Sequence, residues 1–149
     1  MIRELVECVP NFSTSDPETV KEILQAIASV KRVFLLDHSY DDYYNRLVVT
    51  VVGEGRDLVQ AMLRSAVKAV ELIDMRKHKG QHPRLGAVDV VPFVPNLEAT
   101  MERCSELAKS FGRELSARCD VPVYLYGEPA SSPARRHIDW IRDGAVEGL

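Results

Sequence analysis

The alternation of short apolar runs with long amphipathic stretches most restricts the fold of this chain. Short runs rich in branched apolar residues are typical of buried strands, and they occur at residues 5–9, 33–36, 47–52, 88–94 and 121–126. Between them, apolar residues recur at spacings of three and four, which indicates helices. This spacing predicts helices over residues 16–29, 56–75 and 100–117, and a short helix is predicted over residues 133–142.

The resulting order of elements is β-α-β-β-α-β followed by α-β-α. The first six elements are typical of the split βαβ, or ferredoxin-like, arrangement. We therefore predict an α+β fold, with a ferredoxin-like βαββαβ core, an added αβα extension and a mixed or antiparallel sheet. The helices are expected mainly on one face, with Asp16–Ser29 and Arg56–Met75 as the pair packed on it. The other face is left for a partner, a ligand or solvent.

Length and composition predict one domain over residues 1–149. Hydrophobic residues make up 46% and charged residues 28% of the 149 residues, which are globular proportions. The chain has no internal repeat, no low-complexity tract and no Gly/Ser linker. Residues 56–75 form the longest predicted helix, whose apolar stripe must lie on the sheet.

The charge balance and the distribution of apolar and aromatic residues exclude several classes of function. Lys plus Arg is 19 and Asp plus Glu is 22, a net charge of −3, whereas a nonspecific nucleic-acid coat needs a basic surface. The strands also lack the aromatic platform of ferredoxin-like RNA-binding modules, so no nucleic-acid partner is expected. No apolar run is long enough to span a membrane. Residues Arg3, Glu4 and Glu7 exclude a secretory signal, so a cytoplasmic location is expected.

The three cysteines are predicted to be free thiols. Cys8, Cys104 and Cys119 are an odd count with no C-x-x-C spacing, which favours a reducing compartment. Cys8 and Cys104 fall on apolar stripes, so we expect the thiols to be mostly buried.

One segment has the composition of a binding or catalytic site rather than of a structural connection. Residues 76–86 contain four permanent cations and two of the four histidines, without an acid. Such a loop makes a local positive field, whose natural ligand is a small carboxylate or phosphate. Gly80 and Gly86 allow close backbone approach, Pro83 restricts the backbone of His82, and Asp89 follows where it can orient an imidazole.

Three interpretations of this loop remain open on the residues alone. It is a solvated basic loop with ordinary histidines, a metal site built from His78 and His82, or a general base placed in an anion site. The metal interpretation is disfavoured because Gly80 and Pro83 oppose a helix that would align the two histidines. The neighbouring cations would also repel a metal ion.

The loop and the strand after it resemble the signature of the glutamate formiminotransferase family. The resemblance lies in the run from Lys77 to Pro95, KHKGQHPRLGAVDVVPFVP, and in LVECVPNFS at residues 5–13. It extends to LLD at 35–37, Asn45-Arg46, LIDM at 72–75 and VPVYLY at 121–126. These motifs cover essentially the whole chain in order.

The resemblance implies a reaction and a set of site residues. The family transfers a formimino group from N-formimino-L-glutamate to tetrahydrofolate, and its catalytic histidine corresponds here to His82. The resemblance places Lys79 and Arg84 near the anionic groups of the substrates. Asn45 and Arg46, with Asn11 of the N-terminal motif, are implied as further folate or substrate ligands. Tetrahydrofolate is then a co-substrate, and no metal is expected.

The resemblance also implies a second ferredoxin-like half, with the folate bound between the halves. That half is expected as a separate polypeptide or as further chain, and a homodimer is an alternative partner. The other function considered is a noncatalytic subdomain, an interaction or folate-binding module that needs a partner chain. Two departures from the family pattern stand out: Thr14-Ser15 replaces Glu-Gly after Ser13, and His38-Ser39 interrupts the acidic stretch after Asp37.

Overall fold

The computed structural model describes residues 4–80, 84–127 and 129–130. Within them, the chain forms one six-stranded sheet and three helices. The strands are β1 (Val6–Cys8), β2 (Asn11–Phe12), β3 (Val33–Asp41), β4 (Arg46–Gly53), β5 (Val88–Val90) and β6 (Phe93–Pro95). The helices are α1 (Pro17–Ala28), α2 (Gly55–Leu72) and α3 (Met101–Cys119).

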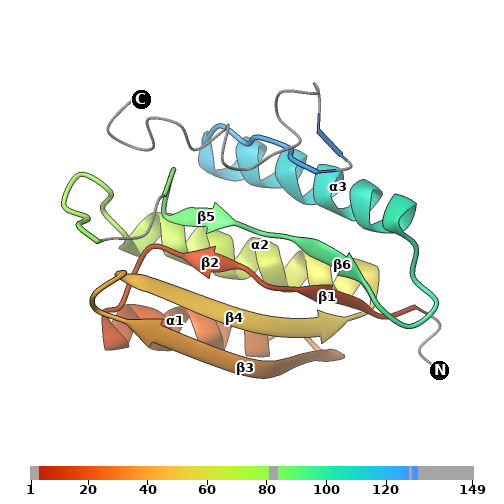
Figure 1. Ribbon diagram of the computed structural model, residues 1–149, viewed down its shortest axis with the longest axis horizontal. Helices are drawn as coiled ribbons and strands as arrows, with labels where there is room; N and C mark the ends of the chain where they lie inside the picture. Colours follow the sequence, from red (N-terminus) through yellow and green to blue (C-terminus); the bar gives the residue numbers. More distant parts are fainter. Residues whose placement is uncertain (1–3, 81–83, 128, 131–149) are drawn as a thin grey trace.

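The sheet has the ferredoxin-like order that the sequence predicts. Strands β1 and β2 follow one another along the chain and both pair with β4. On their other side they pair with β6 and β5, while β3 pairs with the far edge of β4. Every pairing is antiparallel. The order across the sheet is therefore β5/β6, then β2/β1, then β4, then β3 (Figure 1).

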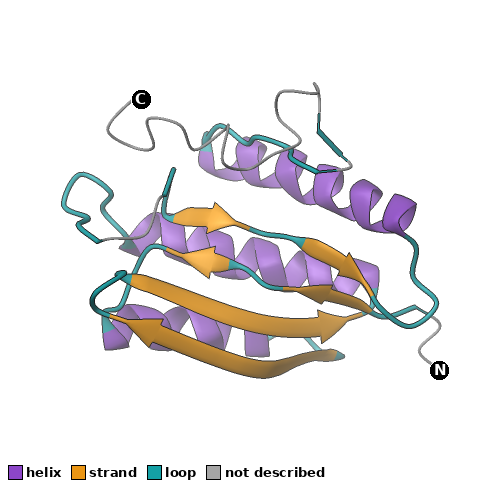
Figure 2. Cartoon of the chain, in the orientation of Figure 1, coloured by secondary structure: helices purple, strands orange, loops and turns teal. Residues whose placement is uncertain are grey.

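The helices share one side of the sheet. Helices α1 and α2 lie behind it in Figure 2 and contact each other, which confirms the predicted pair. Helix α3 packs against α2 and β6, along the edge formed by β5 and β6. No helix of the described part covers the front face of the sheet in this view. None of these helices has the length and apolar character needed to cross a bilayer.

Local sequence explains how α1 begins and what it buries. Asp16 caps the helix by accepting a hydrogen bond from the backbone N–H of Thr19 at 2.9 Å, and Pro17 occupies the first turn. Ile23 and Ile27 then enter the core fully buried, and Leu47, Val49 and Val51 of β4 are fully buried as well. Each such side chain contributes about 1.5–3 kcal/mol through removal from water.

The structure corrects the expected bounds of two strands. The strand expected at residues 33–36 continues to Asp41, because its pairing with β4 extends to Arg46. Polar residues are tolerated there because β3 is an edge strand. The predicted strand at residues 88–94 is divided into β5 and β6 around Pro92, which has no N–H for the ladder.

The predicted strand at residues 121–126 is wrong. These residues form no strand, and Pro122 would interrupt a ladder. Instead, Val123 packs so closely on α3 that a β-carbon at Gly112 would meet its Cγ1 atom at 3.0 Å. Apolar burial on the helix therefore takes the place of strand pairing. The helix expected at residues 133–142 lies outside the described residues.

The cysteines are free thiols, as expected. Cys8 and Cys104 are buried and Cys119 is half-buried. Burial raises the pKa of the Cys8 thiol well above its ordinary value, and it raises the pKa of Cys104 as well. Both thiols are thus held in the unreactive protonated form.

Candidate functional site

The cationic loop begins with a closed turn after α2. The guanidinium of Arg76 donates to both carboxylate oxygens of Asp74 at 2.9 Å, and the backbone N–H of Lys77 donates to the Asp74 carbonyl at 3.0 Å. Hydrogen bonds from the side chain and backbone of Arg76 lower the pKa of Asp74 to about 2. The charge of Arg76 is therefore balanced inside the turn.

Asn45 joins this loop to two other segments of the chain. Its side-chain Nδ2 donates to the Lys79 carbonyl at 2.9 Å, and its Oδ1 accepts from the Ser15 hydroxyl at 3.0 Å. Its backbone carbonyl lies 3.0 Å from Nε2 of His78. The β3–β4 turn, the segment before α1 and the cationic loop meet at this one residue.

Gly80 fits where a side chain would not. A β-carbon at this position would collide with the backbone carbonyl of Tyr44, so the loop lies directly on the β3–β4 turn. The terminal nitrogens of Arg84 donate to the carbonyls of Gly80 and His78 at 3.4 and 3.3 Å. Arg84 thus braces the loop from within.

The far end of the loop is fixed to the start of the chain. The Ser13 hydroxyl, which is buried, donates to the Gly86 carbonyl at 2.7 Å, and the Ser13 N–H donates to the Ala87 carbonyl at 2.9 Å. Asp89 accepts a hydrogen bond from the Leu85 N–H at 2.8 Å. The backbone bond between Ser13 and Ala87 extends the pairing of β2 with β5 toward the loop.

The structure brings together some of the residues predicted for the site. Asn45, Lys79 and Arg84 belong to one hydrogen-bonded cluster. Arg46 starts β4, with its guanidinium carbon 5.4 Å from the centroid of the Tyr44 ring. Asn11 lies opposite Val48 on the neighbouring strand.

Arg46 and Asn11 lie on the face of the sheet that no described helix covers. On β4, Leu47 and Val49 are buried, so Arg46 and Val48 alternate onto the opposite face. Residues directly opposite on paired strands point to the same side, which places Asn11 with Val48. His82, the predicted base, lies outside the described residues, between Gly80 and Arg84 in the sequence.

Two of the loop cations remain available to a ligand. Lys77 and Lys79 are exposed, and neither forms an ion pair within the part of the chain that is described. Lysine ammonium groups in this setting attract carboxylates and phosphates. In the same part, no three His, Cys, Asp or Glu side chains gather into a metal-binding group.

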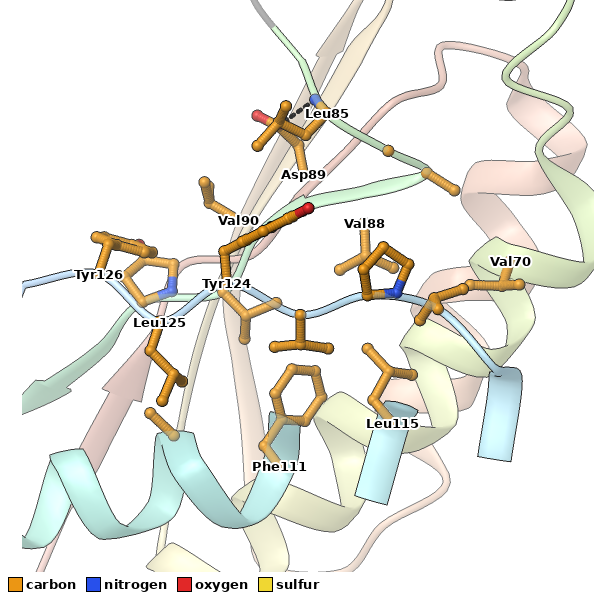
Figure 3. A pocket seen from close by; sticks show the side chains of 18 of the residues that line it. Val70, Leu85, Val88, Asp89, Val90, Phe111, Leu115, Tyr124, Leu125 and Tyr126 are labelled. Atoms are coloured by element: carbon orange, nitrogen blue, oxygen red, sulfur yellow. Dashed lines mark hydrogen bonds between the residues drawn. The ribbon is translucent and has the colours of Figure 1, made fainter. Parts of the chain in front are cut away.

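An apolar pocket of about 1010 Å³ adjoins the two ends of the cationic loop, because Arg76, Leu85 and Gly86 are among its lining residues. It is bounded by the end of α2, by β5 and β6, by α3 and by residues 121–127. Figure 3 shows Phe111, Leu115 and Tyr124 around it. Its lining includes none of Asn11, Asn45, Arg46, Lys79 and Arg84. Its charged lining residues are mostly acidic, so it suits an anionic ligand less well than the loop does.

Sequence reasoning missed the residues that hold the loop in place. Ser15 and His78 both bond to Asn45, although 30 and 33 positions separate them from it. No local pattern connects residues so far apart. In the sequence, the feature that pointed to this packing was Gly80, whose lack of a side chain allows another segment of backbone to approach closely.

Comparison with known proteins finds similar sequences over nearly the whole chain. The family model described as "Formiminotransferase domain, N-terminal subdomain" matches residues 5–149. The chain is 47% identical over 147 residues to the formimidoyltransferase-cyclodeaminase of Rattus norvegicus, covering 98% of this chain and 27% of that protein. It is 45% identical over 140 residues to the glutamate formimidoyltransferase of Thermoplasma acidophilum, covering 93% of this chain and 46% of that protein. A glutamate formimidoyltransferase of Streptococcus pyogenes is 40% identical over 147 residues, covering 98% of this chain and 49% of that protein. The chain thus spans about a quarter to a half of the length of the curated relatives it matches.

Proposed function

Because the chain belongs to the formiminotransferase family, we propose that it is the N-terminal half of a glutamate formimidoyltransferase. In this proposal it helps transfer a formimino group from N-formimino-L-glutamate to tetrahydrofolate. Tetrahydrofolate is the co-substrate, and no metal takes part. Relatives named glutamate formimidoyltransferase, at 40–45% identity, support this assignment.

The proposed step uses His82 as a general base. N5 of tetrahydrofolate forms a bond to the formimino carbon while His82 accepts the N5 proton. The bond from that carbon to the glutamate nitrogen then breaks, and the proton passes to the leaving amine. The products are 5-formiminotetrahydrofolate and glutamate, so atoms and charge balance. A positioned base of this kind contributes about 10²–10⁴-fold to the rate.

The observation that carries the proposal is the anchored cationic loop. Both proposed substrates carry carboxylates, and exposed Lys77 and Lys79 lie on a loop that Asn45 ties to the start of β4. In this proposal Lys79 attracts the carboxylates, while Arg46 and Asn11 contact the folate from the open face of the sheet. Arg84, which donates to two loop carbonyls, acts mainly by shaping the loop.

We further propose that a second half covers the open face of the sheet. The chain covers only 46–49% of the two glutamate formimidoyltransferases. On the open face, Phe34 is paired across the sheet with Val52, and Val52 and Val94 both flank Glu7. Phe34 and Val94 are 51% and 41% exposed, which suits burial under another protein surface.

An assay of formimino transfer tests the proposed function. The chain is mixed with N-formimino-L-glutamate and tetrahydrofolate, with and without a polypeptide carrying the second half. We expect 5-formiminotetrahydrofolate to form when both halves are present. A complex that binds folate but never transfers the group would support the binding-module alternative instead.

A further inference from the structure

We propose that Asn45 is a positioning residue that fixes the cationic loop, rather than a ligand of folate or substrate. The inference rests on the proposed function, in which the same loop carries the base His82. It changes the role that family resemblance implied for Asn45. The contacts of its side chain and of its backbone lead to it independently.

The Asn45 side chain is occupied by the protein at both ends. Its Nδ2 donates to the Lys79 carbonyl at 2.9 Å, and its Oδ1 accepts from Ser15 at 3.0 Å. These two bonds also fix which end of the amide carries nitrogen. A ligand that took over either group would break a contact that holds the loop.

The Asn45 backbone is committed in the same way. Its φ angle of 52° lies in the left-handed region, which asparagine tolerates better than most residues. In this conformation its N–H donates to the Asp41 carbonyl at 2.8 Å, and its carbonyl accepts from His78 Nε2 at 3.0 Å. One residue thus closes the β3–β4 turn and holds two successive residues of the loop, His78 and Lys79.

Loss of the Asn45 side-chain bonds to Ser15 and Lys79 should increase the mobility of the loop without removing a contact to the ligand. Within the loop, the N–H groups of Lys77 and His78 donate to the carbonyls of Asp74 and Met75 at 3.0 and 3.4 Å, and Arg84 donates to the carbonyls of His78 and Gly80. An unanchored loop samples more conformations, so the base spends less time in its reactive position. The expected signature is a lower kcat with little change in folate affinity.

The informative substitution is Asn45→Gly. Glycine keeps the left-handed backbone at no steric cost and removes only the side-chain bonds to Ser15 and Lys79. The matched control is Glu98→Gly, because Glu98 has a φ angle of 53°. Glu98 belongs to the connection between β6 and α3, and that connection lies at the opposite end of the sheet from the loop after α2 (Figure 1).

Hydrogen exchange of the ligand-free 149-residue chain is the first measurement. We expect the Lys77 and His78 amides to exchange about tenfold faster in Asn45→Gly, the factor expected for one or two net hydrogen bonds. They should be unchanged in Glu98→Gly. Unchanged exchange in Asn45→Gly would overturn the proposal.

Kinetics of the reconstituted enzyme are the second measurement. For Asn45→Gly we expect kcat to fall about tenfold while the folate dissociation constant stays within about twofold. Weaker folate binding with unchanged kcat would show direct contact and overturn the proposal. If the wild-type preparation transfers no formimino group, the proposed function fails, whereas the exchange result still decides whether Asn45 holds the loop.

Discussion

The imidazole Nε2 of His78 lies 3.0 Å from the backbone carbonyl oxygen of Asn45. A carbonyl only accepts, so Nε2 must be the protonated nitrogen of this pair. The other ring nitrogen, Nδ1, is buried and has no hydrogen-bond partner among the described residues. His78 therefore acts as an anchor of the loop, which leaves His82 as the histidine of this loop proposed for proton transfer.

The two histidines should differ sharply in catalysis. His82→Ala should lower turnover about a hundredfold or more, since a general base contributes on that order. His78→Ala should cost much less, because it removes a bond to Asn45 rather than the proposed base. Turnover in the reconstituted enzyme, with circular dichroism to verify folding, measures both.

Two results would contradict this assignment of the histidines. Equal losses from His82→Ala and His78→Ala would indicate a paired role, such as a metal site. Full activity of His82→Ala, in a preparation whose wild type is active, would show that another group takes the proton.

Glycine should be required at one of the two loop positions and not at the other. Gly80→Ala should lower the free energy of unfolding by about 1–3 kcal/mol, as overpacking does, because its β-carbon meets the rigid backbone of Tyr44. Gly86→Ala is the matched control, since its β-carbon would have only Val88 O at 3.9 Å. Urea denaturation of both variants measures the difference, and equal stabilities would disprove the close packing of loop and turn.

The sequence predicted the fold well where periodicity and burial act together. The apolar stripe of α1 and the alternating burial of β4 follow directly from the residues, and the order of the elements along the chain indicates the ferredoxin-like arrangement. The strand expected at residues 121–126 failed because an apolar run reports burial but not what it packs against. Val123, which is half-buried, packs on Gly112 of α3 rather than in a ladder.

The candidate site was predictable in composition but not in assembly. The cations of residues 76–86 pointed to an anion site, and Gly80 pointed to a close approach. The bonds from Ser15 and His78 to Asn45 depend on chain topology, which no local pattern records. Arg84 was expected near the anionic groups. Its donation to two carbonyls became visible only in the folded chain.

Acid should weaken the turn that starts the loop. The pKa of Asp74 falls from its ordinary 3.8 to about 2 through its hydrogen bonds with Arg76. A lowered folded-state pKa gives stability that is present above the unfolded value and lost as the pH falls toward 2. Asp74→Asn should therefore show a shallower loss of stability between about pH 4 and 2.

Denaturation midpoints across this range provide the measurement for Asp74. The control is Asp42→Asn, because Asp42 is exposed and forms no ion pair with a described residue. Its pH profile should follow that of the wild type. An Asp74→Asn profile that also matches the wild type would show that the ion pair with Arg76 does not persist in solution.

The resemblance implies that Lys79 and Arg84 both contact the anionic groups, but we expect different roles for them. Lys79 should bind the ligand, whereas Arg84 should stabilise the loop. Lys79→Met should weaken folate binding about two- to fivefold, the range for an exposed charge pair, and leave stability within about 0.5 kcal/mol. Arg84→Met should instead destabilise the chain by about 1 kcal/mol, because it removes donors to the carbonyls of His78 and Gly80.

Folate titration of the reconstituted complex at two ionic strengths measures the effect of Lys79→Met. Salt screens an exposed charge, so the loss of folate affinity in this variant should be smaller at the higher ionic strength. Denaturation measures the effect of Arg84→Met. A purely ligand-binding Arg84 would leave the unfolding midpoint unchanged and weaken folate binding more than Lys79→Met does.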